Sequence, residues 1–278
     1  MSQTVLARKW RPKCFPEIIG QDHVSKALSN ALNSGRLHHA YLFSGTRGVG
    51  KTTIARILSK CLNCERGVSA TPCGQCLSCK EIANDRFVDL IEVDAASRTG
   101  VDDMRDLLNN VQYLPARGRF KVYLIDEVHM LSKSSFAALL KTLEEPPEHV
   151  KFLFATTDHK KVPITILSRC LHFSLRAISA QKIAHHLKNV LENENVGFCE
   201  ESILSISKAA DGSVRDALSL TDQAIGIGGG SIDKSGVDAM LGSVEKYLLN
   251  DICEHIASND VTALLESIDK MAQTSPDY

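Results

Sequence analysis

Apolar and polar positions recur along the chain with two different periods, and the pattern changes near residue 177. Up to that point, short continuous apolar runs alternate with stretches in which apolar residues recur every three or four positions. The short runs are typical of buried β-strands, whereas the longer period indicates amphipathic helices. The predicted strands cover residues 40–43, 88–93, 121–125, 151–156 and 171–175.

The predicted helices separate these strands, and this alternation determines the expected fold class. They cover residues 21–33, 101–112 and 134–144, and another helix follows the first strand after a glycine-rich turn. Strands that alternate with helices form a parallel sheet covered on both faces. We therefore expect an α/β domain with a five-stranded parallel sheet over residues 1–177.

Beyond Ser179 the pattern is helical, and it contains no convincing strand. Helices are predicted over residues 179–193, 200–210, 213–226 and 233–242, with a flexible joint at Gly228-Gly229-Gly230. This pattern indicates an all-α domain over residues 178–243. A further helical stretch over 244–278 predicts the beginning of a third, helical domain that continues past Tyr278.

The glycine-rich turn after the first strand predicts a phosphate-binding loop. Its glycines let successive backbone N–H groups point inward at phosphate oxygens, and the dipole of the next helix adds to the attraction. Lys51 can reach the β- and γ-phosphates of a nucleotide, and the Thr52 hydroxyl can ligate Mg²⁺. The expected nucleotide-binding residues here are Gly45, Thr46, Arg47, Gly48, Val49, Gly50, Lys51, Thr52 and Thr53.

An acidic pair, Asp126 and Glu127, ends the third predicted strand. In an open parallel sheet, the C-terminal ends of the strands meet at the ligand crevice. Asp126 can therefore hold the Mg²⁺ that Thr52 also ligates, while Glu127 orients and deprotonates the attacking water. Phosphoryl transfer also needs polar and cationic groups, for which the candidates are Thr156, Thr157, Arg169 and Arg215. On spacing alone, each arginine is more often a surface salt-bridge partner.

Four cysteines, Cys64, Cys73, Cys76 and Cys79, form a compact group with two gaps of two residues. This spacing places thiolates on one tight turn and suits tetrahedral zinc. An iron–sulfur cluster and unliganded thiols are the alternatives. Because no candidate catalytic group stands beside the cysteines, we interpret the zinc as structural.

The composition of the chain restricts the possible classes of function but does not identify one. The chain has 278 residues and a net charge of −1, which argues against a surface coated with basic residues for nucleic acid but leaves room for a local basic groove. The sequence contains no apolar run of membrane-spanning length and no signal-peptide core. We therefore expect a cytoplasmic protein without a membrane partner.

Several longer motifs together are similar to one known family. They are GTRGVGKT, the cysteine block with TPCGQC, DAASRTG, VYLIDEVHML, ALLKTLEEPPEHV, SRC and GSVRDALSLTDQAI. The chain resembles the gamma/tau family of bacterial DNA polymerase III, the AAA+ ATPase motor subunits of sliding-clamp loaders, up to about residue 243. The resemblance implies a P-loop α/β domain with a zinc module inserted at about residues 61–85, a helical lid, and a collar domain that oligomerises.

The resemblance also implies roles for individual residues. Lys51 and Thr52 would serve the phosphates and Mg²⁺, and Asp126 and Glu127 would hold the metal and activate water. Thr157 would be the first sensor, with Thr156 as the second choice, and Arg215 would be the sensor in the lid. Arg169 would act as a finger in the ATP site of a neighbouring subunit. The adenine would lie against the segment Ala7–Pro12 and against the pair Ile18 and Ile19, with Arg11 and Pro12 as the contacts within the segment. The alternative for Trp10 is that it fills the core.

The expected partners follow from the same resemblance. They are the other subunits of a hetero-oligomeric clamp loader, the sliding clamp, the polymerase core, and primed DNA bound through its phosphate backbone. The candidate DNA contacts are Arg98, Thr99, Arg105 and Lys141. No polymerase active site is expected in the chain. Two alternatives remain open at this point, namely another AAA+ DNA motor such as a branch-migration helicase, and a nucleotide-switched scaffold that hydrolyses little ATP.

Overall fold

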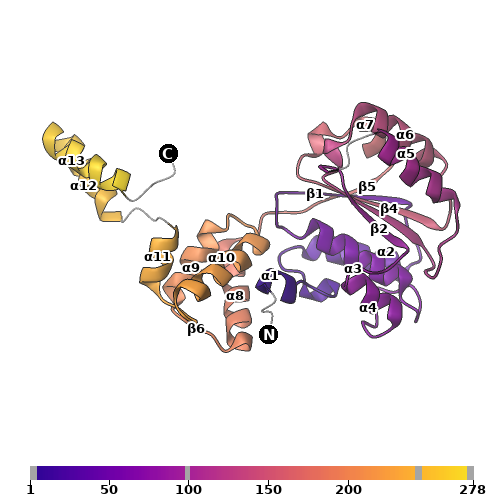
Figure 1. Cartoon of the computed structure of the whole chain (residues 1–278), viewed down its shortest axis with the longest axis horizontal. Helices are drawn as coiled ribbons and strands as arrows, with labels where there is room; N and C mark the ends of the chain where they lie inside the picture. Colours follow the sequence, from indigo (N-terminus) through magenta and orange to yellow (C-terminus); the bar gives the residue numbers. More distant parts are fainter. Residues whose placement is uncertain (1–4, 98–100, 242–245, 274–278) are drawn as a thin grey trace.

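The computed structural model describes residues 5–97, 101–241 and 246–273. Figure 1 shows an α/β domain, a smaller helical domain beside it, and a pair of helices at the C-terminal end. None of the helices in the described ranges is both long enough and apolar enough to cross a membrane.

The sheet of the α/β domain is confirmed as five-stranded and parallel. Its strands lie in the order β2-β3-β4-β1-β5, and every neighbouring pair is parallel. Ser44 at the end of β1 pairs with Thr156 at the end of β4, so the loop that follows β1 begins level with that strand end. The strands are β1 (Ala40–Ser44), β2 (Leu90–Asp94), β3 (Lys121–Asp126), β4 (Val150–Thr156) and β5 (Leu171–Ser174).

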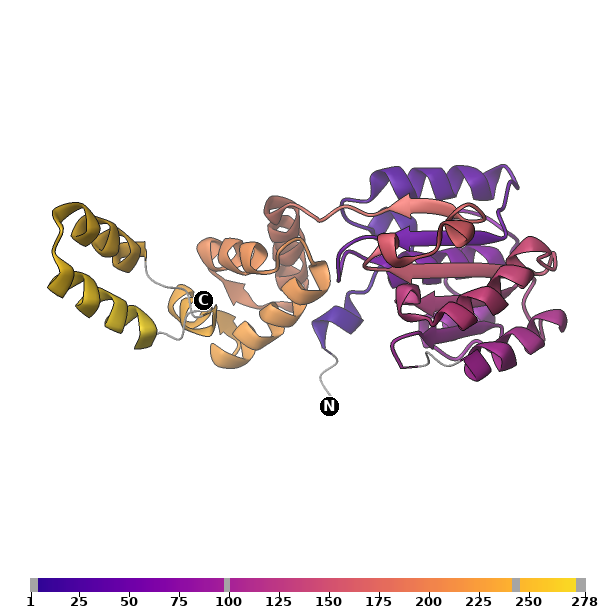
Figure 2. The ribbon, with the colours of Figure 1, turned by 90° about the horizontal axis from the view of Figure 1, so that it is seen from above.

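Alternate residues of each strand point to opposite faces of the sheet. Both faces of the central strands β1, β3 and β4 are buried, whereas the edge strands β2 and β5 are more exposed. In β1, Tyr41 and Phe43 pack toward the layer that contains α2 and α3, whereas Leu42 packs toward the layer of α5, α6 and α7. The labels of Figure 1 place α2 and α3 on one side of the sheet and α5, α6 and α7 on the other, and Figure 2 views the sheet from the side of α5, α6 and α7. The helices are α2 (Asp22–Asn33), α3 (Lys51–Asn63), α5 (Val101–Asn109), α6 (Lys133–Glu144) and α7 (Ile164–Leu167).

Local sequence explains where these helices begin and end. α3 begins after Gly50, whose φ of +102° lies in the left-handed region that glycine adopts without steric cost. α6 begins at a cap in which the Ser132 hydroxyl accepts the Ser135 N–H, and it ends before the Pro146-Pro147 pair. Shorter elements are α1 (Leu6–Lys9), α4 (Leu77–Ala83) and the 3₁₀ turns Phe15–Glu17, Asn110–Gln112, Val128–Met130 and His159–Lys161.

The second domain is built from four helices with a shared apolar core. They are α8 (Ala180–Glu194), α9 (Glu200–Ala209), α10 (Val214–Ile227) and α11 (Lys234–Leu241). The expectation of no strand after Ser179 is wrong, because β6 (Gly197–Phe198) pairs in parallel with β7 (Ser231–Ile232). Two-residue strands are too short to produce an alternating pattern in the sequence.

The N-terminal helix α1 packs on the helical domain rather than on the sheet. Leu6 lies in the core of that domain, and its N–H donates to the Asp222 carboxylate at 2.8 Å. The Trp10 indole N–H donates to Glu194 at 2.7 Å, and the Lys9 ammonium contacts the same carboxylate. The tryptophan therefore fixes the N-terminal segment to α8.

The C-terminal helices α12 (Lys246–Ser258) and α13 (Val261–Gln273) pack against each other. Asn259, between them, adopts a φ of +54°, which an asparagine tolerates in a tight turn. Figure 1 shows this pair beyond α11. Its apolar side chains Ile256, Val261, Leu265 and Ile268 are exposed.

Candidate nucleotide site and cysteine cluster

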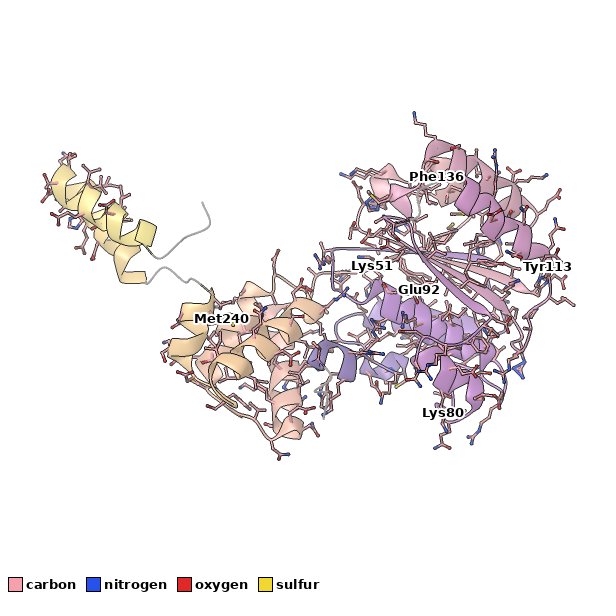
Figure 3. The ribbon with its side chains drawn as sticks, in the orientation of Figure 1. Lys51, Lys80, Glu92, Tyr113, Phe136 and Met240 are labelled. Carbon is pink, nitrogen blue, oxygen red and sulfur yellow. The ribbon has the colours of Figure 1, made fainter. Side chains whose placement is uncertain are left out.

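A cleft lies where the α/β domain meets the helical domain, and residues of both domains line it. Figure 3 shows Lys51 on the side of the α/β domain that faces the helical domain. The lining residues that the sequence predicts are Arg11, Pro12, Ile18, Ile19, Arg47, Gly48, Val49, Gly50, Lys51, Thr52, Thr53, Asp126, Glu127 and Arg215.

The phosphate loop folds around the Lys51 ammonium. Lys51 is only 6% exposed, and its Nζ donates to the carbonyl oxygens of Gly45 and Thr46 at 2.9 Å each. Burial lowers the pKa of Lys51, while the nearby Glu127 and Asp126 carboxylates raise it. Gly45 and Thr46 thus contact the lysine and do not line the cleft themselves. The lysine can exchange these two carbonyls for phosphate oxygens.

Two glycines of the loop permit close approach of the chain segments that follow β5. A Cβ on Gly45 would lie 2.7 Å from the Leu175 carbonyl oxygen, and both glycines have positive φ. A Cβ on Gly48 would overlap the Ser213 hydroxyl and approach Arg215 Cβ to 3.3 Å. The loop therefore lies directly against the first turn of α10.

Asp126 and Thr52 form an oxygen-rich corner beside the loop. The Thr52 hydroxyl donates to Asp126 Oδ2 at 2.8 Å, and the Glu127 N–H donates to Asp126 Oδ1 at 2.9 Å. A hydroxyl and a carboxylate next to a phosphate site are the hard oxygen ligands that suit Mg²⁺. This donor set fits the expected magnesium ion.

Glu127 directly follows the C-terminal end of β3, and neighbouring residues contact its side chain. Its backbone adopts the left-handed conformation with φ +46°, which is uncommon for a non-glycine residue. Its Oε2 accepts the Thr157 N–H at 3.0 Å and the Thr157 hydroxyl at 2.8 Å. Thr156 is fully buried, and its hydroxyl lies 2.9 Å from His129 Nδ1. Of the two candidate threonines, Thr157 is thus the one that contacts Glu127.

The other wall of the cleft is apolar and includes residues that sequence reasoning missed. Ile18 is buried, and Ile19 packs against the core of the helical domain. Burial lowers the pKa of Arg11, and the Arg56 charge lowers it further. The residues not predicted are Ile178, His186, Val214 and Leu218. Ile178 lies in the segment before α8 and the other three lie on helices, and no sequence signal distinguishes them from core residues.

The two candidate arginines occupy different places. Arg215 lies in the first turn of α10 and lines the cleft. Arg169 lies outside the lining and donates to the Thr165 carbonyl at 2.8 Å and to the Glu144 carboxylate at 2.6 Å. Arg215 therefore lies at the cleft of its own chain, whereas Arg169 contacts α6 and α7.

The four predicted cysteines come together between α3 and α4. Their sulfur atoms all lie within 4.8 Å of one another, and tetrahedral zinc with Zn–S bonds of 2.3 Å requires separations of about 3.8 Å. Backbone N–H groups point at three of the sulfurs, with distances of 3.4 Å from Cys73 to Cys64, 3.3 Å from Cys76 to Cys73 and 3.4 Å from Cys79 to Cys76. This Cys₄ group fits a structural zinc ion.

Electrostatics differ among the four thiols. Backbone hydrogen bonds lower the pKa of Cys73 to about 6, which favours the thiolate that a metal requires. Burial raises the pKa of Cys79. Cys76 also caps α4, because its sulfur accepts the Cys79 N–H. The cysteines therefore connect the end of α3 to the beginning of α4 through one small cluster.

Two of the four candidate DNA-contacting residues lie within the described ranges. Arg98 and Thr99 lie outside the described residues. Arg105 on α5 and Lys141 on α6 are both exposed, and the two helices pack side by side in one layer.

The sheet order, the phosphate loop and the helical domain after it define the AAA+ P-loop ATPase fold. The family profile described as "DNA polymerase III, delta subunit" matches residues 20–179, and "DNA polymerase III clamp loader subunit, ATPase lid domain" matches residues 182–230. The chain belongs to the DNA polymerase III clamp-loader family of tau and gamma subunits. The predicted family and fold class are confirmed.

Individual relatives support this assignment. The chain is 64% identical to DNA polymerase III subunit tau of Escherichia coli K12 over 245 residues, which are 88% of this chain and 38% of that protein. It is 54% identical to subunit gamma of Buchnera aphidicola (from Acyrthosiphon pisum) over 96% of this chain and 75% of that protein. The chain thus spans about two fifths of the length of the tau relatives.

A solved structure shares the fold at low sequence identity. The Thermotoga maritima RuvB Holliday junction branch migration motor aligns with a TM-score of 0.63 and 22% identity, over 89% of this chain and 79% of that chain. This similarity concerns the fold alone.

Proposed function

We propose that this chain is the ATP-driven motor of a clamp loader, which opens a sliding clamp and loads it onto primed DNA. The observation that carries the proposal is the convergence of Lys51, Thr52, Asp126 and Glu127 on one cleft. Arg215 of the helical domain faces the same cleft, so a bound triphosphate would contact both domains. Family membership favours this role over a branch-migration motor.

Each of these cleft residues has a separate role in ATP hydrolysis. Lys51 binds phosphate oxygens in place of the loop carbonyls, and the loop N–H groups bind the others. Thr52 and Asp126 hold Mg²⁺, which neutralises charge on the β- and γ-phosphates. Glu127 orients the attacking water and accepts its proton, while Thr157 holds the Glu127 carboxylate.

The two arginines act in different active sites. Arg215 contacts the γ-phosphate in its own chain and thereby links hydrolysis to the position of the helical domain. Arg169 completes the site of a neighbouring subunit, a role supported by its place outside its own cleft. Because the cleft of a single chain does not receive its own Arg169, turnover requires a neighbouring subunit and therefore the assembly.

The remaining groups stabilise the assembly or contact partners. Cys64, Cys73, Cys76 and Cys79 hold zinc as a structural ion, and α12 with α13 begins the collar through which the subunits associate. The proposed domains are 1–177, 178–243 and 244–278. Partners are the other loader subunits, the clamp, the polymerase core and the DNA backbone, with Arg98, Thr99, Arg105 and Lys141 as DNA contacts, in the cytoplasm.

The experiment uses the full-length protein, reconstituted with its partner subunits. We expect ATP turnover that increases when clamp and primed DNA are added together, and we expect Lys51→Ala to abolish it. The exposed Lys182→Ala is the matched control, because it removes a lysine of α8 that does not line the cleft. Absence of stimulation in an assembly that binds both clamp and DNA would contradict the proposal, and sustained strand displacement would favour a helicase.

A further inference from the structure

His129 lies two residues after Glu127, in the 3₁₀ turn that follows β3. Its side chain is only 9% exposed. Its Nδ1 lies 2.9 Å from the Thr156 hydroxyl and 3.3 Å from Glu127 Oε2. The imidazole thus contacts the Glu127 carboxylate, although His129 is not among the residues that line the cleft.

The neighbours of Nδ1 determine which nitrogen carries the proton. An unprotonated Nδ1 would direct its lone pair at a carboxylate oxygen, which is repulsive. The Thr156 hydroxyl oxygen already accepts the Asp158 N–H at 3.1 Å and can accept a second donor. A proton on Nδ1 is donated to the Thr156 hydroxyl and places a positive N–H dipole beside Glu127 Oε2, so the favoured state is the Nδ1–H form.

The same contacts connect the Glu127 turn to the phosphate loop. The Thr156 carbonyl oxygen accepts the N–H of Gly45, the first glycine of the loop, at 3.2 Å. The Thr156 hydroxyl contacts His129, and His129 contacts Glu127. One buried residue at the end of β4 therefore connects the loop that binds phosphate with the histidine that contacts Glu127.

We propose that His129 is a positioning residue that fixes the Glu127 carboxylate relative to the phosphate loop. This inference rests on the proposed ATPase function. Thr157 donates two hydrogen bonds to Glu127 Oε2, and His129 Nδ1 lies 3.3 Å from the same oxygen. All of these contacts involve Oε2, so Thr157 and His129 together fix the position of that oxygen, whereas without His129 it is held by Thr157 alone. His129 itself takes no part in proton transfer with water, because it does not reach the cleft.

The test compares variants that keep or remove the donor at the position of Nδ1. His129→Asn places its amide nitrogen near that position, whereas His129→Leu removes the donor and keeps the apolar volume. The control is His185→Leu on the exposed face of α8. Each variant is studied as full-length protein in the reconstituted clamp loader, with single-turnover ATP hydrolysis and ATP affinity measured separately.

We expect His129→Leu to lower the hydrolysis rate by about 10- to 100-fold, because the N–H dipole beside the Glu127 carboxylate is lost. ATP affinity stays within about two-fold, because His129 does not line the cleft. His129→Asn retains most of the rate. In a Glu127→Gln background the loss caused by His129→Leu largely disappears, since a residue that acts through Glu127 has no further effect without it.

Other outcomes would overturn the inference. A normal rate for His129→Leu, or an equal loss for His129→Asn, would show that the donor does not position Glu127. An undiminished loss in the Glu127→Gln background would indicate a general structural role. If His129→Leu does not fold, His129→Gln replaces it, because its longer amide does not superimpose on Nδ1. Absence of turnover in the unmodified assembly would contradict the proposed function instead.

Discussion

Gly48→Ala tests the contact between the phosphate loop and the helical domain. Gly48 has a φ of +75°, and an added methyl group would overlap the Ser213 hydroxyl. That hydroxyl caps α10 by accepting the Asp216 N–H at 3.1 Å. The methyl group can therefore be accommodated only if the Ser213 hydroxyl turns away and leaves the helix without its cap. It would also lie 2.9 Å from Ser213 Cβ, so the loop must shift slightly whether or not the hydroxyl is present.

The magnitude follows from two contributions. A non-glycine residue in the left-handed region costs about 1 kcal/mol. Loss of the serine cap costs about 1 kcal/mol more. Gly48→Ala is thus expected to destabilise the protein by about 2 kcal/mol. In a Ser213→Ala background the cap is already absent, so the same substitution costs about 1 kcal/mol less there. The coupling between the two positions is then about 1 kcal/mol.

Urea unfolding without nucleotide measures this coupling. Trp10 is the only tryptophan, and it contacts Glu194 of α8, so its fluorescence reports on the helical domain. With a slope of about 2–3 kcal/mol per molar urea, the coupling corresponds to a midpoint difference of about 0.3–0.5 M. Gly50→Ala is the matched control, because its φ is +102° but no atom lies within 4 Å of the added Cβ.

The result that would refute the reasoning is equal destabilisation by Gly48→Ala with and without Ser213. Such additivity would mean that the methyl group displaces the whole helical domain and leaves the cap intact. The control Gly50→Ala is expected to be additive with Ser213→Ala, since only backbone strain is involved.

Three further predictions address other parts of the molecule. Cys76→Ser, or removal of metal by a chelator, lowers the thermal midpoint and releases zinc that a colorimetric reagent detects; an unchanged midpoint with no zinc released would argue against the metal site. Arg169→Ala abolishes turnover in the assembly and leaves ATP affinity unchanged in calorimetry, and lost affinity would argue against action in a neighbouring site. Glu194→Gln destabilises the protein at pH 7, because hydrogen bonds from Lys9 and then Trp10 lower the pKa of Glu194 below its ordinary 4.5. This stabilisation is complete above pH 4.5 and is lost as the pH falls through the lowered pKa, so urea midpoints of the two proteins converge in acid; a constant difference would contradict the assignment.

The sequence predicts the sheet because its central strands are buried on both faces. Continuous apolar runs such as residues 151–156 have few other stable interpretations, and the structure has β4 at 150–156. The phosphate loop and the cysteine group are predictable for a related reason. Their chemistry depends on residues that are near one another in the chain, so the spacing of these residues in the sequence is enough to identify both sites.

The parts that sequence reasoning missed depend on contacts between distant segments. Leu218 and Ile178 line the cleft because α10 and the segment before α8 come to lie beside the loop, and hydrophobic period reports only that such residues are buried. The same limit applies to His129, whose partner Thr156 lies on a different strand. The β6–β7 pair is missed because two residues are too few to establish a period.

The central claim is that Glu127 activates water for hydrolysis of a triphosphate held by the loop. The most direct measurement is the rate of phosphate release by the reconstituted assembly carrying Glu127→Gln, under saturating ATP and with clamp and primed DNA present. The amide keeps the shape of the side chain but cannot accept the proton, so we expect the rate to fall by about 100-fold or more. A rate equal to that of the unmodified assembly would contradict the account.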